Sequence, residues 1–378
     1  MLRKFLFICS IFSFVFIHSG VQANDLRVFY AGFAFIGDNV NITKNYPHAL
    51  AISKEKDSED LLLEKVLREK VKNQNMNNFK LIIGELGNLE EGEGISVAFA
   101  LDNETVAIEQ IGSYYKIVID LGAQVLFFDF KEMKVIGCYP VAIQLIDVSE
   151  SKPADILIKN RIRELFIGNK YEINIFDEFV KRLKDIEIKP KFKNSIKVSN
   201  VTIEEKALPF LPTIYIDDKD PNKNNIKTLL AQNFSKFLSS NQEISVLPYT
   251  KGSAIGDKMS ARFANGEVYM LEIPEAQFLI DLTLRGFKKV KFDEKKAGSS
   301  WIYGVYIKLK IFEPLLQKYY IDEKFKHGAT KIIPASQKNV ADWPAFQESL
   351  FVLFDSLTKS FSTERKFKSV KKVLEKCK

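Results

Sequence analysis

The stretch "GAQVLFFDFKEMKVIGCYPV", residues 122–141, reads as two β-strands separated by the polar break "KEMK". A second stretch, "GVYIKLKIFEPLLQKYYIDE", residues 304–323, is built in the same way around "EPLLQ". Both contain runs of β-branched and aromatic residues on either side of a turn signal, which is the pattern of a β-hairpin. Gly122 opens the first hairpin and Gly304 opens the second. The repetition predicts a chain made of two similar halves.

The segments around each hairpin follow one order: strand, helix, strand, a three-stranded meander and one or two closing helices. We therefore expect an α+β protein with two similar α/β sandwich-like domains, each a mixed sheet with helices packed on it. The first domain is expected at residues 24–187 and the second at 208–362, where "PTIYIDD" supplies the opening strand. The Lys- and Pro-rich segment 188–207 is interpreted as a linker, with an edge strand at "SIKVSNVTI" as an open alternative.

The first 23 residues have the layout of a secretory signal peptide, and the domains follow it. Arg3 and Lys4 precede an apolar run, residues 5–17, and Ala23 ends a small-residue stretch suited to cleavage. A membrane anchor is the alternative, but a run of 13 residues is short for crossing about 30 Å of hydrocarbon. The expected location is therefore periplasmic or secreted.

Composition excludes some classes of function. The full chain has a formal net charge of +7, but the charges of both signs are mixed along it, whereas nucleic-acid binding usually requires a concentrated basic face. We accordingly expect no nucleic-acid partner. Cys138 and Cys377 remain after cleavage. In an exported protein they can form one bridge or stay free, and the sequence leaves both possibilities open.

The sequence contains no clear motif for catalysis or metal binding. His48 and His327 have no neighbouring His or Cys with metal-ligand spacing, so no metal or cofactor site is predicted. Asp120, Asp129 and Asp281 lie in otherwise apolar strands, where buried carboxylates can form an acid pair. The alternative is that they face solvent or cap the backbone. We predict no catalytic residue.

The C-terminal segment 363–378 is predicted to be a basic tail. The residues predicted for a possible interaction are Arg365, Lys366, Lys368, Lys371 and Lys372. One interpretation is a short amphipathic helix that touches an anionic membrane or an acidic partner. The other interpretation, a solvated and frayed terminus, is the one that we favour from the sequence.

The second half resembles the α/β domain shared by the CsgG-like secretion proteins and the TolB N-terminal domain. The resemblance rests on "NNIKTLLAQNFSKFLSS", "EAQFLIDLTLRG" and the paired strands that precede "PAFQESLFVLFDSL". Gln277 stands where that family usually has Asp after the alanine. The family has no active site, so the resemblance implies an envelope scaffold or periplasmic adaptor.

These observations together predict an exported, non-catalytic binding or assembly component of a cell-envelope machine, such as a secretion or transport apparatus. Its expected partners are other envelope proteins, with self-association as a further possibility and at most a peripheral membrane contact. The alternatives are a secreted hydrolase with an unfamiliar site and a secreted effector protein.

The signal-peptide interpretation makes a direct prediction. The exported protein should begin at Asn24, because Ala23 completes the small-residue cleavage pattern. N-terminal sequencing or intact mass of the exported protein measures this. A mature protein that retains Met1 would contradict it.

Overall fold

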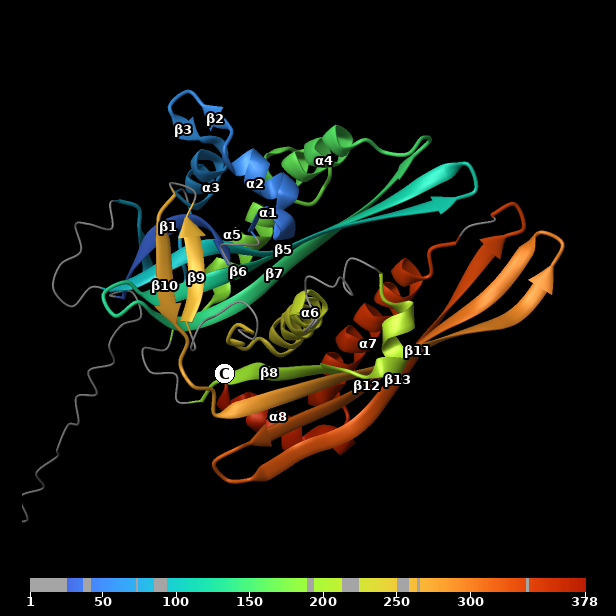
Figure 1. Ribbon diagram of the computed structural model, residues 1–378. Coiled ribbons are helices and arrows are strands. Elements are labelled where there is room, and N and C mark those ends of the chain that lie inside the picture. Colours follow the sequence, from blue (N-terminus) through green and yellow to red (C-terminus); the bar gives the residue numbers. More distant parts are fainter. Residues whose placement is uncertain are drawn as a thin grey trace, which may run out of the picture.

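A computed structural model describes residues 26–36, 42–72, 74–84, 94–188, 194–212, 224–249, 258–263, 266–337 and 340–378. The protein is α+β, with two mixed β-sheets and helices packed on them. Figure 1 shows the sheets one above the other, with α6 (Asn224–Gln242) between them. The signal peptide and most of "PTIYIDD" lie outside the described residues.

The first sheet has the strand order β4-β1-β5-β6-β7-β10-β9. Its strands are β1 (Arg27–Ile36), β4 (Lys80–Ile82), β5 (Ile95–Ile111), β6 (Tyr114–Asp129), β7 (Lys134–Ser149), β9 (Lys258–Phe263) and β10 (Val268–Glu272). One face is covered by α1 (Ile42–Asn45), α2 (Pro47–Ser53), α3 (Leu62–Lys72), α4 (Asp155–Ile167) and α5 (Ile175–Asp185). A two-stranded ribbon, β2 (Lys56–Asp57) and β3 (Asp60–Leu61), precedes α3.

Strands β9 and β10 come from the second half of the chain, yet they complete the first sheet. β10 pairs with β7, β9 pairs with β10, and β9 also pairs with β1, so the strands close into a ring. The ring surrounds a separate apolar cluster that includes Leu126, Cys138, Phe263 and Leu271. The expected division of the chain did not include this exchange. Independent folding of residues 24–187 and 208–362 therefore stays a prediction, and the ring couples the two halves.

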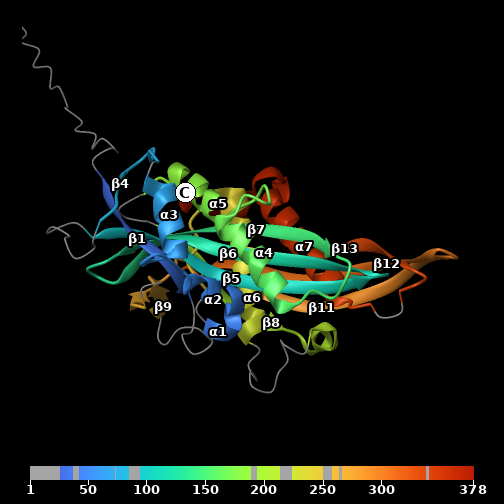
Figure 2. The same cartoon turned by 90° about the horizontal axis from the view of Figure 1, so that it is seen from above.

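The second sheet has the order β13-β12-β11-β8. Its strands are β8 (Ile196–Ile203), β11 (Phe278–Lys295), β12 (Gly298–Glu313) and β13 (Lys318–Pro334). A 3₁₀ helix, η4 (Glu205–Phe210), follows β8, and α6, α7 (Trp343–Thr363) and α8 (Lys368–Lys376) pack on one face. No described helix of the chain covers the other face. Figure 2, seen from above, shows how far both sheets extend past the helices.

Both halves have the same topology, and both hairpins of the sequence analysis are present. In the first half β1 runs parallel to β5, which continues antiparallel into β6 and β7. In the second half β8 runs parallel to β11, which continues antiparallel into β12 and β13. On the far side of each opening strand lies another parallel partner, β4 in the first half and a single bridge at Leu247 in the second.

The opening strand expected at "PTIYIDD" lies mostly outside the described residues, and among those described the strand parallel to β11 is β8. β8 takes that place, so part of the segment interpreted as a linker belongs to the sheet. The edge-strand alternative at residues 195–203 is the correct one, because Ile196, Val198 and Val201 are buried in the second core.

The frayed-terminus interpretation of residues 363–378 is also wrong. This segment forms a short 3₁₀ helix, η6 (Arg365–Phe367), followed by α8. Phe367, Val370, Val373 and Leu374 are buried against α7 and β13, because their spacing places them on one side of the helix. Cys377 is buried beside them, whereas Cys138 lies in the ring cluster, and both thiols are free. Among the described helices, none is both long and apolar enough to cross a membrane.

The ring makes a testable prediction. Leu271 and Met270 are neighbours on β10, but Leu271 is fully buried in the ring and Met270 is 45% exposed. Leu271→Ala should lower the free energy of unfolding by about 2–5 kcal/mol because it leaves a cavity. Met270→Ala, the matched control, should change it by no more than about 0.5 kcal/mol. Denaturant unfolding measures both, and equal effects would show that β10 does not pack into the first sheet.

Candidate functional site

Helix α6 meets both sheets, and its two sides differ in chemistry. Ile226, Leu230, Phe234 and Leu238 face the core of the second sheet. Gln232 and Lys236 lie one helical turn apart, and Gln232 Nε2 donates a 2.9 Å hydrogen bond to the Asp102 carbonyl oxygen in the first sheet. The helix therefore joins the two halves through an apolar side and a polar side. Figure 1 shows α6 between the two sheets.

Lys236 of α6 is close to a group of polar residues on β5, β6 and β7, which we call the polar junction. It comprises Asp102, Thr105, Asp120, Gln124 and Gln144. Gln124 Nε2 donates to Asp102 Oδ2 at 2.5 Å, and Gln144 Nε2 donates to Asp120 Oδ1 at 2.7 Å. Thr105 Oγ1 donates to Asp120 Oδ2 at 3.3 Å. The charged groups of this junction are thus held by side-chain amides and a hydroxyl, and each carboxylate has at least one donor.

Local geometry explains how Asp102 reaches the junction. The pairing of β5 with β6 shifts register between Leu101 and Asn103, so Asp102 is the extra residue of a β-bulge. A bulge redirects the side chain that it contains. Gly122 lies beside it, and a Cβ atom there would be 2.9 Å from Asp102 Oδ1. The glycine that opens the first hairpin thus leaves room for this carboxylate.

Burial dominates the electrostatics of the junction. It raises the pKa of Asp102 to about 6, although the Gln124 hydrogen bond and the Lys236 charge oppose this. It also raises the pKa of Asp120 and lowers that of Lys236, since a low-dielectric environment disfavours each charged form. The carboxylates and the ammonium favour one another's charged forms. The junction is therefore a buried charge network that holds α6 to the first sheet.

The carboxylates considered as an acid pair do not come together. Asp120 lies in the junction. The other carboxylate of the junction is Asp102, which the sequence analysis did not single out. Asp129 Oδ1 accepts backbone N–H groups of the turn, from Lys131 and Glu132 at 2.9 Å each. Asp281 accepts a 2.9 Å hydrogen bond from Ser199 Oγ in the second sheet. Asp129 and Asp281 thus have turn and sheet roles.

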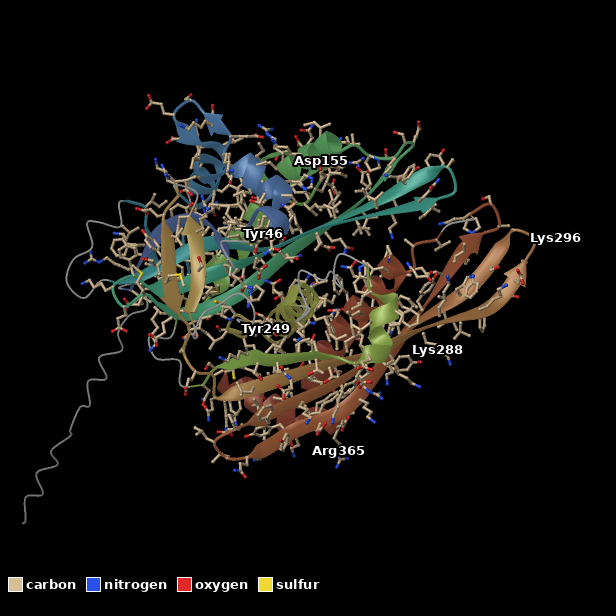
Figure 3. All side chains as sticks on the ribbon, viewed as in Figure 1. Tyr46, Asp155, Tyr249, Lys288, Lys296 and Arg365 are labelled. Atoms are coloured by element: carbon tan, nitrogen blue, oxygen red, sulfur yellow. The ribbon has the colours of Figure 1, made fainter. Side chains whose placement is uncertain are left out.

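His48 is held on both sides of its ring. Its Nδ1 lies 2.7 Å from Glu104 Oε1, and its Nε2 lies 2.9 Å from Asp155 Oδ1. Glu104 also accepts the backbone N–H groups of His48 and Ala49 at the start of α2. The hydrogen bond to Glu104 is the largest cause that raises the pKa of His48. The imidazole therefore clamps α2, β5 and α4 together, and Figure 3 marks Asp155 at this place.

His327 lies elsewhere, on β13 opposite Val305 in the second sheet. Within the described part of the chain, no group of three His, Cys, Asp or Glu side chains is arranged to hold a metal ion.

A small cavity lies where the two halves meet. It has a volume of about 150 Å³, below the range of about 300–1,000 Å³ typical of ligand pockets. Its polar groups have protein partners: Ser245 Oγ accepts the Cys138 N–H at 3.1 Å, and Ser195 Oγ donates to the Glu275 carbonyl at 3.3 Å. The lining is Ile136, Asn194, Ser195, Ser245, Leu247, Pro274, Glu275 and Gln277.

The basic residues predicted for interaction are exposed on η6 and α8. They are Arg365, Lys366, Lys368, Lys371 and Lys372. Lys366 lies 3.0 Å from Glu364 and over the Phe367 ring, and Lys371 Nζ lies 3.5 Å from the Ser362 carbonyl oxygen. Figure 3 marks Arg365 at the outer side of the second half. Their role in binding stays a prediction.

The sequence analysis missed two projecting arms. Each hairpin glycine lies mid-strand, and the sheet continues past it until its outer end projects beyond the helices (Figures 1 and 2). The first arm comprises residues 104–121 and 143–149, and the second comprises residues 286–303 and 329–334. Strands of 16 to 18 residues form them, whereas about 5–6 is usual. The unusual length of the alternating apolar and polar runs in the sequence could have indicated these arms.

Both arms expose apolar side chains. On the first arm Ile146 and Val148 are each 57% exposed, and Ile108, Ile111 and Tyr114 are also exposed. On the second arm Phe292 is 71% exposed and Ile332 is 75% exposed. These two surfaces are the candidate functional sites, because side chains of this size are rarely left in water in such groups.

Comparison with known proteins gives no family. No family model matches the chain, and no curated protein is similar to it. Among solved structures, the hypothetical protein CT253 from Chlamydia trachomatis has 11% identity and a TM-score of 0.25, over 45% of this chain and 98% of that one. A putative neuraminyllactose-binding hemagglutinin homolog from Helicobacter pylori has 10% identity and a TM-score of 0.25, and the match covers 50% of this chain and 97% of that one. A minor lipoprotein from Acinetobacter baumannii has 7% identity and a TM-score of 0.22, and the match covers 45% of this chain and 90% of that one. Such scores carry no argument about function.

The junction predicts a pH dependence of stability. Because the pKa of Asp102 is raised to about 6 from 3.8, the folded protein keeps a proton there that the unfolded chain has released. The contribution of this group to stability therefore falls as pH rises from about 4 to about 6. In Asp102→Asn this fall should be absent. The difference in unfolding free energy, wild type minus variant, should drop by about 1–3 kcal/mol between pH 4 and pH 7.

Denaturant unfolding at a series of pH values measures this difference. Asp293→Asn, at an exposed aspartate of β11, is the control for general charge effects. A difference between wild type and Asp102→Asn that stays constant with pH would contradict the assignment of a buried carboxylate.

Proposed function

We propose that this protein is an exported, non-catalytic binding or assembly component of the cell envelope, periplasmic or secreted, that works by contacts with other envelope proteins. The exposed apolar face of the first arm carries the proposal. Grouped exposed apolar side chains on a soluble protein typically mark an interaction surface. The resemblance of the second half to the CsgG-like and TolB N-terminal domain belongs to the same proposal and is consistent with it.

The strand register places these side chains on one face. Ile146 lies opposite Val118, and Val148 lies opposite Lys116, so all four point to the same side of the sheet. The other side, which carries Ile117, Ile119 and Leu145, belongs to the first core with the helices. The arm therefore has one face anchored by its own core and one face available to a partner.

The contacts at the two chemistry-bearing clusters favour binding over the hydrolase alternative. A histidine that acts as a general base needs one ring nitrogen directed at a nucleophile. In His48 both nitrogens face carboxylates, Glu104 on one side and Asp155 on the other. In the junction, Asp102 and Asp120 accept hydrogen bonds from glutamines that fix them in place. Both clusters join elements of the fold.

Site-specific crosslinking in the source cell tests the proposal. A photoreactive amino acid at Ile146 or Val148 should give a defined adduct with another envelope protein or with a second copy of the chain. Leu315, which is 89% exposed at the opposite end of the second sheet, is the control position. The changes Ile111→Ser and Tyr114→Ser, at two residues that lie opposite each other on the same face of the arm, should weaken the adduct, because they remove neighbouring apolar contact area.

Two results would contradict the proposal. One is a protein that is exported and folded but forms no adduct at either first-arm position. The other is a set of adducts that is the same at Leu315 as on the arm, which would indicate random collisions.

A further inference from the structure

The second arm differs from the first in charge. Within its residues 286–303 and 329–334 the sequence has six lysines against one aspartate and one glutamate. The equivalent residues of the first arm, 104–121 and 143–149, have four acidic residues against one lysine. Three of the four first-arm carboxylates are engaged within the fold: Glu104 by His48, Asp120 in the junction and Asp147 by Arg161. The second arm is therefore the one that presents excess charge to solvent.

The lysines of the second arm fall into two groups. Lys289 Nζ lies 2.6 Å from Asp342, and Lys331 Nζ lies 2.5 Å from Glu348, so these two anchor the arm to the start of α7. The remaining lysines are exposed along the arm from its base to its tip: Lys288, Lys291, Lys295 and Lys296. Figure 3 marks Lys288 where the arm leaves the body and Lys296 at its tip.

The tip retains positive charge after its own ion pairs are counted. Lys291 pairs with Glu294 at 3.0 Å and Lys295 with Asp293 at 3.5 Å. Such exposed pairs contribute little and exchange readily with other partners. Among the described residues, no carboxylate lies within ion-pair distance of Lys288 or Lys296. The tip therefore carries a net positive field around its apolar side chains.

The apolar side chains of the tip lie together on one face. Val290 is opposite Ile302 on β12, and Ile332 on β13 is opposite Ser300, two residues from Ile302 along the same strand. Phe292 occupies the β-bulge beside them, between Lys291 and Asp293. Phe292 and Ile332 are the most exposed of the set. This face points away from the helices that cover the other side of the sheet.

We propose that the tip of the second arm binds an anionic lipid membrane surface. Phe292 and Ile332 would enter the boundary between headgroups and acyl chains, while Lys291, Lys295 and Lys296 contact the lipid phosphates. Exposed aromatic and aliphatic side chains ringed by lysines match the requirements of an interfacial anchor, which combines apolar burial with attraction to anionic lipids. A purely acidic protein would use the lysines but leave Phe292 and Ile332 in water.

This surface is separate from the protein contact proposed for the first arm, and either can hold without the other. The arm also differs from the basic side of α8, where the sequence analysis placed a membrane contact. There the apolar side chains are buried in the core, so only lysines and an arginine are presented.

Vesicle co-sedimentation tests the proposal with the chain from Asn24 onward, which contains every described residue. The probes are vesicles of phosphatidylglycerol with phosphatidylcholine, and vesicles of phosphatidylcholine alone. The protein should sediment with the anionic vesicles and not with the neutral ones. Lys295→Glu with Lys296→Glu should weaken binding by at least about tenfold, because two attractive charges become repulsive. Phe292→Ser with Ile332→Ser should also weaken it by about tenfold or more.

The matched control is Lys368→Glu with Lys372→Glu, the same change of charge on exposed lysines of α8, which should leave binding within about twofold. Equal unfolding midpoints show that all variants are folded. Trp301 adds a local readout, because it lies on β12 with Lys289 Nζ 4.6 Å from its ring. In the variant Trp343→Phe, Trp301 is the one remaining tryptophan. The fluorescence of Trp301 in this variant should change when anionic vesicles are added.

Three results would overturn the proposal. The first is the absence of binding by the wild-type chain to anionic vesicles. The second is binding that survives both arm variants and is lost in the α8 variant, which would move the contact to α8. The third is binding to polyglutamate that matches the binding to vesicles and is unchanged by Phe292→Ser with Ile332→Ser, which would indicate an acidic protein as the partner. None of these results affects the crosslinks expected at the first arm.

Discussion

Helix α6 has to pack against two sheets at once, and the rest of the structure depends on how it does so. Its apolar side completes the core of the second sheet, while Gln232 and Lys236 meet the polar junction of the first. Buried charges are costly unless other charges and hydrogen bonds compensate them. Asp102 and Asp120 supply the charges, and Gln124 and Gln144 supply the hydrogen bonds. A helix that faced only one sheet would not need this arrangement.

The ring around β9 and β10 adds a second constraint with the same effect. Residues 258–263 and 268–272 leave the second half, close the first sheet and return to begin β11. Together with α6 they fix one half against the other. Two arms that project from a coupled body can present an apolar face and a basic apolar face at the same time. That combination suits a component that links a protein partner to a membrane surface.

Part of this structure could be predicted from the sequence, and the reason is local. The two hairpins follow from strand-forming runs around short polar breaks, which need no knowledge of distant contacts. β8 was ambiguous because its apolar positions alternate with lysine, serine and asparagine, as an edge strand allows. β9 and β10 were missed because a short strand is favoured only by the ring that it closes. α8 was underestimated because its lysines are conspicuous, whereas its burial depends on a core formed by other elements.

The candidate sites show the same limit. Asp120 was considered from its apolar surroundings, but Asp102 reaches the junction through a bulge that only pairing with β6 creates. The lysines at 288–296 were visible, but their meaning depends on the exposed Phe292 and Ile332, which the sheet brings to the same tip although they are 40 residues apart in the chain. Local patterns thus predicted elements, and the surfaces required the topology.

The claim that α6 and the ring couple the halves can be tested by following the unfolding of each half separately. Both tryptophans, Trp301 and Trp343, belong to the second half, so their fluorescence reports on it alone. Hydrogen exchange of the β5 and β6 amides, measured at the same denaturant concentrations, reports on the first half. The coupled structure predicts one common midpoint for both signals. A first half that remains protected after the tryptophan transition is complete, or the reverse, would contradict it.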